Sequence, residues 1–397
     1  MSANEIPPYS PPKDIVIIGG GVIGCTSACY LSRHPRASST KVTILEAGAI
    51  AGGASGKYGG LVAKWVSPKE LVDVAFAEHV ALAEEHGGEA RWGWRILNCG
   101  WWRGRVGCPR RRGKKADGVE VPEDLDWLDS GATEAYRSMA GDGETAQVHP
   151  YLFTTSMLAL AQEKGVKLIK GRATSIQYTE DSQVSGVNYV DSNGADGILT
   201  ADTIILSAGP WTPTLLPQVP IWGHRAHSIT ILPSQPVSPY FLFTSFTYPV
   251  GDATGTATRT WPGTRTAGPD ILTCPNNEVF VCAAREDSEP LPDGTKDVVV
   301  DEKVCDQLVK DVGMMSKPLR DGEVTMRQAC YLANAGSGNG CPIVGRVEGI
   351  GGLVVAAGHA STGVCNAPGT AKAISELLID GEITCADLSR LAPKNFF

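Results

Sequence analysis

The sequence predicts an α/β protein of two domains, one with helices packed on a parallel sheet and one α+β. Two observations predict this fold. Near each end of the chain an apolar strand, DIVII at 14–18 and LVVAA at 353–357, leads into a glycine-rich turn and a helix. Between them, residues 228–325 show mostly β patterning, with many Thr, Pro and Gly. Strands alternating with helices are typical of a parallel sheet, and a β-rich block is typical of a separate antiparallel sheet.

Size, composition and charge exclude several classes of protein. The 397 residues exceed one common domain, and 42% hydrophobic with 20% charged residues is typical of a globular protein. The apolar runs are far shorter than the roughly 18 residues that span a bilayer. A net charge of -8 disfavours nucleic acid, whose binding depends on Lys and Arg neutralising phosphates. We therefore expect neither a membrane span nor a nucleic-acid partner.

The cysteines and the first residues indicate a reducing compartment. Of the eleven cysteines, only Cys25 and Cys29 lie close together, and no two CxxC units could build a zinc site. The first dozen residues, MSANEIPPYSPP, lack the cationic start and apolar run of a signal peptide. We expect free thiols, no metal and a cytoplasmic protein.

Three glycines form a GxGxxG motif between the first strand and the first helix. Gly19 permits a tight turn, Gly21 lets the backbone approach a pyrophosphate, and Gly24 allows the helix to pack closely on the strand. The N–H groups at the start of the helix can then bind phosphates. Glu46 ends the next strand, KVTILE, where a carboxylate accepts hydrogen bonds from the adenosine ribose and disfavours a 2′-phosphate. This βαβ unit predicts binding of FAD or NAD rather than NADP.

The remaining elements follow from hydrophobic spacing. Leu71, Val74, Ala75, His79, Leu82 and Ala83 recur at helical intervals. Further along the chain we expect a helix at 154–164, a strand at 166–170, a hairpin over 173–200, a strand at 203–207, and helices at about 301–312 and 367–380.

These elements predict a discontinuous domain organisation. Residues 1–65, 148–215 and 326–397 should form the nucleotide-binding domain. Residues 66–147 and 216–325 should form the substrate-binding domain. The sequence shows no internal repeat.

Five segments, in a fixed order, carry a resemblance to a known family. They are IIGGGVIG at 17–24, GASGKYGGLV at 53–62, QVHPYLFT at 147–154, SAGPWT at 207–212, and CPIVG at 341–345 with AAGHASTGVCNAPGTAKAISELLIDGE at 356–382. With them the chain resembles the FAD-dependent amine and amino-acid oxidases, which include D-amino acid oxidase, glycine oxidase and sarcosine oxidase. The amino-acid sequences of several segments are most similar to those of a fungal subgroup of FAD-dependent oxidoreductases. The resemblance implies a Rossmann-like FAD-binding domain of the glutathione-reductase type and an inserted α+β substrate domain built on an antiparallel sheet.

The resemblance also implies which residues contact FAD. Because Cys330 aligns poorly with the position of covalent attachment in the family, we expect FAD to be bound without a covalent link. The turn that opens the last helix would lie under the flavin pyrimidine ring, where a helix N-terminus stabilises negative charge. His359 could instead be a structural histidine, and Trp211 a core residue. The implied cofactor residues are Gly19, Gly21, Val22, Ile23, Gly24, Glu46, Ala47, Ser55, Gly56, Lys57, Gly59, Gly60, Leu61, Ala173, Ala208, Gly209, Trp211, Gly358, His359, Ser361, Thr362, Gly363 and Val364.

The sequence departs from the family at two positions. Amino-acid oxidases usually hold the substrate carboxylate with an arginine that here would precede CPIVG, yet no arginine occurs between Arg327 and Arg346. Arg225 or Arg285 would have to replace it. Cys330 lies near the position where sarcosine oxidase-like enzymes attach flavin, and a buried apolar thiol is the alternative interpretation.

The leading hypothesis is oxidation of a C–N bond in an amine or amino-acid-like molecule, with hydride transfer to flavin N5 and reoxidation by O2 to hydrogen peroxide. Without the arginine, a bulky, less polar amine is the expected substrate. A flavin monooxygenase, suggested by VGDAT from residue 250, and a flavoprotein that binds or reduces a protein partner are the alternatives. Candidates for the substrate side are Tyr58, Lys64, His227, Tyr331 and Asn334.

Overall fold

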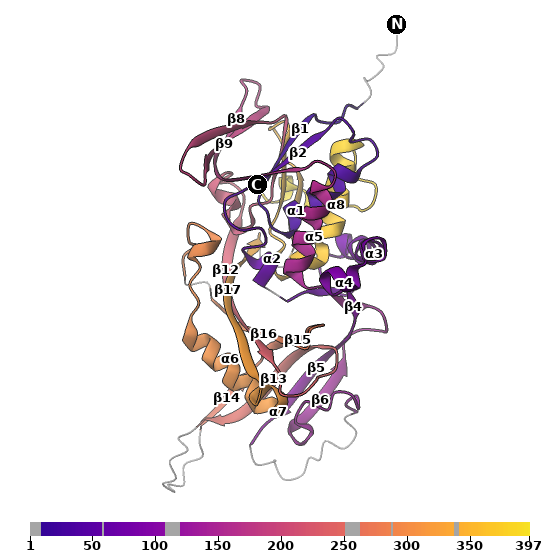
Figure 1. The fold of residues 1–397 in the computed structure, drawn as a ribbon, viewed down its shortest axis with the longest axis vertical. Coiled ribbons are helices and arrows are strands. Elements are labelled where there is room, and N and C mark those ends of the chain that lie inside the picture. Colours follow the sequence, from indigo (N-terminus) through magenta and orange to yellow (C-terminus); the bar gives the residue numbers. More distant parts are fainter. Residues whose placement is uncertain (1–8, 58, 108–119, 251–262, 287–288, 337–340) are drawn as a thin grey trace.

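The protein contains two eight-stranded sheets and a small three-stranded sheet (Figure 1). The computed structural model describes residues 9–57, 59–107, 120–250, 263–286, 289–336 and 341–397. Tyr58 and most of the VGDAT segment lie outside these ranges. The two large sheets lie at opposite ends of the long axis in Figure 1. Residues of both sheets can therefore contribute to a site that lies between them.

The first sheet has the strand order β10-β9-β8-β2-β1-β11-β19-β18. Its centre is parallel, because β1 pairs in parallel with both β2 and β11, and β11 with β19. The central strands are apolar and β-branched, as expected for strands buried on both faces. The bounds are β1 Asp14–Ile18, β2 Lys41–Glu46, β8 Lys167–Tyr178, β9 Val184–Asp191, β10 Asp196–Thr200, β11 Thr203–Leu206, β18 Ile343–Arg346 and β19 Leu353–Ala357.

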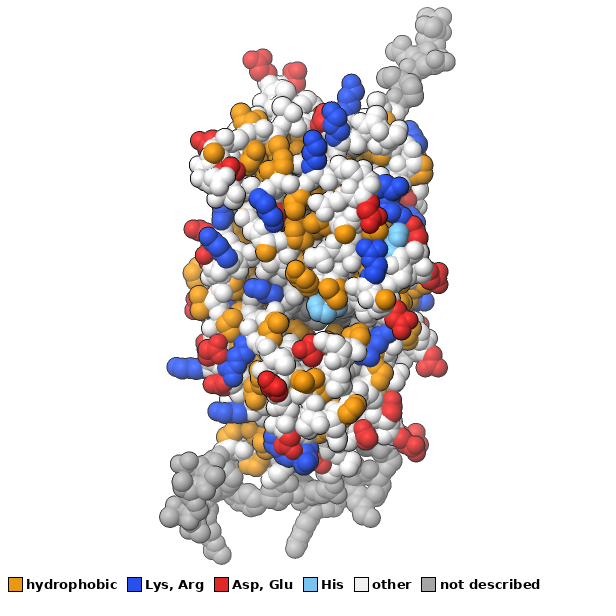
Figure 2. Space-filling model, viewed as in Figure 1, with side chains coloured by type: hydrophobic (Ala, Val, Ile, Leu, Met, Phe, Trp, Pro, Cys, Tyr) orange, Lys and Arg blue, Asp and Glu red, His pale blue; other side chains and the backbone are white. Residues whose placement is uncertain are grey.

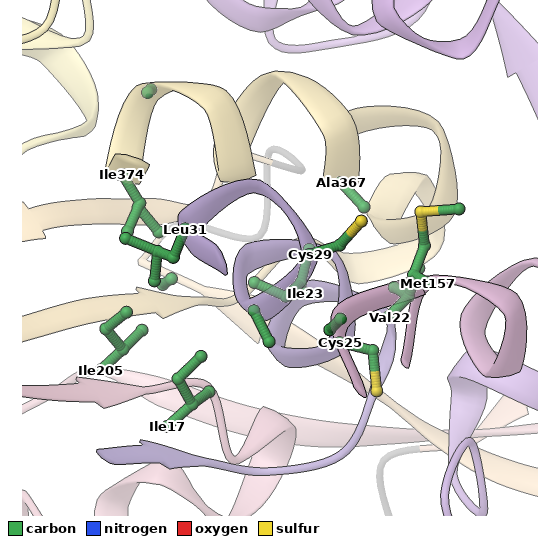
Figure 3. Packing of buried hydrophobic residues seen from close by; sticks show 14 of the residues in the cluster. Ile17, Val22, Ile23, Cys25, Cys29, Leu31, Met157, Ile205, Ala367 and Ile374 are labelled. Carbon is green, nitrogen blue, oxygen red and sulfur yellow. The ribbon is translucent and has the colours of Figure 1, made fainter. Parts of the chain in front are cut away.

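Helix α1 (Val22–Arg33) is the centre of the first core. Nine of its twelve residues are buried, so neighbouring elements surround it on most sides. It packs on α5 (Pro150–Gln162) and α8 (Gly363–Ile379), and α8 also packs on α3 (Lys69–His86). Figure 3 shows side chains of the sheet and of α8 gathered around α1. This packing fixes the N-terminus of α1 against the ends of the parallel strands.

The second sheet has the order β17-β12-β16-β15-β13-β5-β6, with β14 on β13. One face carries a large apolar cluster that includes residues of α6 (Glu302–Met315) and α7 (Lys317–Arg320). The bounds are β5 Asn98–Arg105, β6 Thr133–Ser138, β12 Ile221–Leu232, β13 Tyr240–Val250, β14 Gly263–Ala267, β15 Asp270–Thr273, β16 Val279–Glu286 and β17 Glu323–Ala335. The expected domain boundary at 326 falls inside β17, and the domain boundaries stay a prediction.

Short elements join the two large sheets. The strands β3 (Leu61–Ala63), β7 (Thr145–Gln147) and β4 (Arg95–Ile96) form the third sheet. The helices are α2 (Ala54–Lys57) and α4 (Gly88–Trp92), and the 3-10 turns include η2 (Gly209–Thr214), η3 (Thr295–Asp297) and η4 (Ala360–Thr362).

Three expected boundaries were wrong by four residues or more. The helix expected at 154–164 is α5, which begins at Pro150. The strand expected at 166–170 continues to Tyr178, so Ala173 lies within β8, at an irregularity of its pairing with β9, and not after the strand. The last helix begins at Gly363 and contains Pro368, although a helix start at 367 was expected. Proline has no N–H to donate to the carbonyl four residues earlier, which is that of Val364. His79 Nε2 instead lies 2.9 Å from the Val364 oxygen, so a buried side chain satisfies the carbonyl that the proline leaves open.

Burial of His79 predicts a loss of stability in acid. Desolvation lowers the pKa of His79 to about 4, below the value of about 6.5 expected for the unfolded chain. Between these values the unfolded chain binds more protons, so stability falls as the pH falls through that window. His79→Gln keeps an N–H donor and removes the titration. Between about pH 7.5 and pH 5, the free energy of unfolding should fall by about 2 kcal/mol less in this variant than in the wild type, measured by urea unfolding.

The control for this prediction is His79→Leu, which removes both the donor and the titration. It should be less stable than the glutamine variant at both pH values, by about 1–3 kcal/mol, because the Val364 carbonyl loses its partner. An unchanged pH dependence in both variants would contradict the role given to His79.

Candidate active site

A cavity of about 680 Å³ opens at the carboxyl ends of the parallel strands. This is the edge at which sheets of this type bind ligands. Its wall combines the turn after β1, the end of β2, the turn after β11 and the turn after β19. Of the predicted cofactor residues, those on the wall are Gly19, Gly21, Val22, Ile23, Glu46, Ala47, Ser55, Gly59, Ala173, Ala208, Gly209, Trp211, Gly358, His359, Ser361, Gly363 and Val364. Those not on it are Gly24, Gly56, Lys57, Gly60, Leu61 and Thr362.

The glycine turn brings three pieces of backbone into close approach. Gly19 has φ +113°, and a Cβ there would lie 2.4 Å from the Ser207 carbonyl oxygen. A Cβ at Gly24 would lie 2.0 Å from the Gly19 oxygen. Gly21 is different, because its Cβ would meet only the Ser55 side chain, at 3.0 Å. Two of the glycines are therefore required by packing inside the protein, and the third leaves room beside the helix N-terminus.

Glu46 and Ser55 organise the polar side of this turn. The Glu46 carboxylate accepts hydrogen bonds from the N–H of Gly20 at 2.5 Å and of Gly48 at 2.6 Å. Each carboxylate oxygen has a second lone pair, so the group can still accept from a ribose hydroxyl. The Ser55 hydroxyl accepts from the N–H of Val22, the first residue of α1, at 2.9 Å. The site thus presents backbone N–H groups and a carboxylate, as a dinucleotide requires.

The turn after β19 places a buried histidine at the other side of the cavity. Gly358 has φ +83°, and a Cβ there would lie 2.5 Å from Ala335 Cβ, so only glycine fits against β17. His359 Nε2 lies 3.0 Å from Thr370 Oγ1. Burial lowers the pKa of His359 to about 3, so the ring is neutral near pH 7. A positive charge at this side of the cavity therefore does not come from His359, whereas the N-terminus of α8 contributes positive potential here.

The predicted substrate-side residues do not gather at the cavity. Tyr331 lines it, and its hydroxyl donates to the Pro290 carbonyl at 2.9 Å. Lys64 is exposed, with Nζ 5.0 Å from the Phe76 ring centre. His227 is fully buried and accepts from the Asp301 N–H at the start of α6, at 3.0 Å. Asn334 is not on the wall, and its backbone bridges to that of His359.

Of the two residues that could replace the missing arginine, the structure describes the side chain of Arg225 alone. Arg225 is buried outside the cavity wall, with Nη2 3.9 Å from Glu289 Oε1. Of the Arg285 side chain nothing is described. Cys330 packs with Ala226 and Leu332, and burial raises the pKa of its thiol to about 12. The thiol is therefore protonated near pH 7 and a poor nucleophile.

Sequence reasoning missed part of the wall. Arg172 and Thr174 reach it from β8, and residues 291–296 reach it from the connection between β16 and α6. The sequence of that connection, PLPDGTKD, predicts only a turn that contains Pro and Gly. No motif marks it, because its contacts are with residues distant in sequence.

Two further classes of site find no support in the described parts of the chain. No three His, Cys, Asp or Glu side chains among the described residues gather closely enough to hold a metal ion. Over the same ranges, no helix is both long and apolar enough to cross a membrane.

The fold and the cavity are those of a dinucleotide-binding protein. The chain belongs to the DAO family, described as FAD dependent oxidoreductase, which matches residues 14–377. It is 30% identical to "Putative oxidoreductase C1F5.03c" of Schizosaccharomyces pombe, over 97% of this chain and 99% of that one. It is 29% identical to "Putative oxidoreductase TDA3" of Saccharomyces cerevisiae, over 97% and 95%. Glycine oxidase from Geobacillus kaustophilus has the same fold, with a TM-score of 0.70, 19% identity and coverage of 97% and 98%.

The close approach at Gly24 gives a direct test of the site. Gly24→Ala forces a methyl group to 2.0 Å from the Gly19 carbonyl, so β1 and α1 must separate and the helix N–H groups must move. We expect at least a tenfold loss of FAD affinity, measured by fluorescence titration of the apoprotein. The control is Gly313→Ala in α6, where the nearest atom to the new methyl would be 3.4 Å away. Equal affinities of the two variants would show that the turn does not position the cofactor.

Proposed function

We propose that this protein binds FAD without a covalent link and oxidises a C–N bond of a bulky, weakly polar amine. The observation that carries the proposal is the single cavity wall built from the glycine turn, Glu46 and the turn before α8. Membership of an FAD-dependent family supports the cofactor. Family membership alone does not define the substrate.

The chain's own residues fit FAD. The N–H groups around Gly21 and Val22 would bind the pyrophosphate, and Glu46 would bind the ribose. The N-terminus of α8 would lie at the flavin ring, where it favours negative charge. Bound FAD would supply the chemistry, accepting a hydride from the substrate carbon to leave an imine and returning two electrons to O2 as hydrogen peroxide. The protein would supply orientation and a site from which water is excluded.

The face of the second sheet that approaches the cavity is apolar. Gly59 lines the cavity, and a Cβ there would lie 3.3 Å from the Phe280 ring and 3.7 Å from Leu272. Phe280 and Leu272 belong to a cluster that includes Phe241, with Phe243 and Trp65 packed against it. None of these cluster side chains is on the cavity wall, so they lie behind Gly59. Apolar surroundings of this kind favour ligands with few polar contacts, which supports a substrate with a large apolar part.

A flavoprotein that reduces a protein partner is the second candidate. It is favoured by the placement of Arg225 outside the cavity wall, because Arg225 then does not supply the carboxylate ligand. This candidate predicts flavin reduction without rapid peroxide formation, so the two functions can be separated.

The cysteine thiols and the surface charge bear on the location and the partners that we propose for the protein. The ten described cysteines are all free, which supports our proposal of a cytoplasmic location. Figure 2 shows acidic and basic side chains interspersed on one face, with no field of a single sign. A nucleic-acid partner is therefore not part of the proposal.

The proposed substrate class predicts a selective oxidase. An arginine–carboxylate pair contributes about 1.5–3 kcal/mol per hydrogen bond, so its absence should weaken binding of small amino acids at least tenfold. We expect slow or no anaerobic bleaching of the flavin by glycine, sarcosine and D-alanine. Bulky cyclic or aromatic amines should bleach it, and O2 should then yield hydrogen peroxide. Rapid bleaching by any of the three small amino acids would contradict the proposed class, and bleaching without peroxide would favour the second candidate.

The buried thiol of Cys330 predicts that the flavin is released by denaturation. Acid precipitation of the yellow protein should leave all the flavin absorbance in the supernatant. Cys330→Ala should behave in the same way as the wild type. Flavin that stays with the wild-type pellet but leaves that of Cys330→Ala would overturn this prediction.

A further inference from the structure

The connection between β16 and α6 crosses from the second sheet to the cavity of the first. Its residues 291–296 all line the cavity, although the chain on either side belongs to the second sheet and its helix. In Figure 1 the orange chain before α6 extends from that helix towards the first sheet. We call residues 290–298 the strap.

Three side chains hold one end of the strap, and all three donate to its backbone carbonyls. The Tyr331 hydroxyl donates to Pro290 at 2.9 Å, and Trp211 Nε1 donates to Pro292 at 2.7 Å. Arg172 Nη1 donates to Asp293. The donors come from β17, η2 and β8, so three separate elements around the cavity hold consecutive parts of the strap.

The other end of the strap packs on the loop after β2. A Cβ at Gly48 would lie 2.9 Å from Thr295 Oγ1, and one at Gly52 would lie 3.0 Å from it. Glycine at these positions lets the strap approach the backbone of the loop that follows Glu46. The strap therefore runs along the cavity from β17 to the end of β2, where the ribose carboxylate lies.

We infer that the strap is the gate of the cofactor site: it retains FAD when closed and must detach before FAD can leave. The inference rests on the proposed function, because FAD is the ligand that the strap would retain. An extended dinucleotide lying between Glu46 and the turn before α8 would run beneath the strap along much of its length. Its release then requires the strap anchors to break, so the anchors control the dissociation rate of FAD.

A reversible cross-link tests this inference. A Cβ at Gly53 would lie 3.5 Å from Thr295 Cγ2, and the sulfur of a cysteine at 295 can take the place of that γ atom, so the two positions can be tested with a disulfide. In Gly53→Cys/Thr295→Cys loaded with FAD, oxidation should slow release of FAD at least tenfold, followed by flavin fluorescence during dilution. Dithiothreitol should restore the original rate. Thr295→Cys alone, treated in the same way, is the control and should not respond.

A second variant tests the anchors without a cross-link. Tyr331→Phe keeps the ring on the cavity wall and removes the hydroxyl that donates to Pro290, so release of FAD should become about two- to tenfold faster. The matched control is Tyr178→Phe, a change at an exposed ring of β8, which should leave the rate unchanged.

The outcomes separate this inference from the proposed function. If the wild-type chain binds no FAD, the proposed function fails. If it binds FAD but oxidation forms no cross-link, the strap does not lie on the loop after β2 and the inference is overturned. A cross-link that leaves the release rate unchanged overturns it equally, whereas FAD binding and the proposed function would stand.

Discussion

The close approach of backbone at the end of β1 is the constraint on which the rest of the site depends. Gly19 turns with a positive φ against Ser207, and Gly24 packs its helix turn on the Gly19 carbonyl. Side chains at either position would separate α1 from the strands. Because α1 is buried on most sides by α5 and α8, its position also sets theirs. The N–H groups that face the cavity are thus fixed by the core and not by the ligand.

The elements predicted most accurately are those with a local physical cause. The strands at 14–18, 41–46 and 353–357 have the predicted bounds, because short apolar β-branched runs bounded by turns leave little alternative. The last helix was misplaced because Pro368 reads locally as a helix start. Its tolerance inside α8 depends on His79, which lies in a different helix and cannot be foreseen from the neighbouring sequence.

The substrate side was predicted less well for a related reason. Lys64 and His227 have residue types suited to catalysis, but their surroundings decide their roles: one is exposed and the other accepts a hydrogen bond at the start of α6. Likewise, the strap has no motif, since its function would follow from contacts with Trp211 and Arg172. Glycine motifs predict backbone geometry well, whereas side-chain roles depend on distant partners.

Together, the two sheets divide the work of the site. The first sheet supplies backbone donors and one carboxylate, and the strap reaches the cavity from the connection between β16 and α6. The central claim is that this cavity is built for FAD, and calorimetric titration of the apoprotein with FAD and with NAD tests it most directly. We expect one FAD bound per chain and no binding of NAD at the same concentrations. Absence of FAD binding, or tighter binding of NAD, would contradict it.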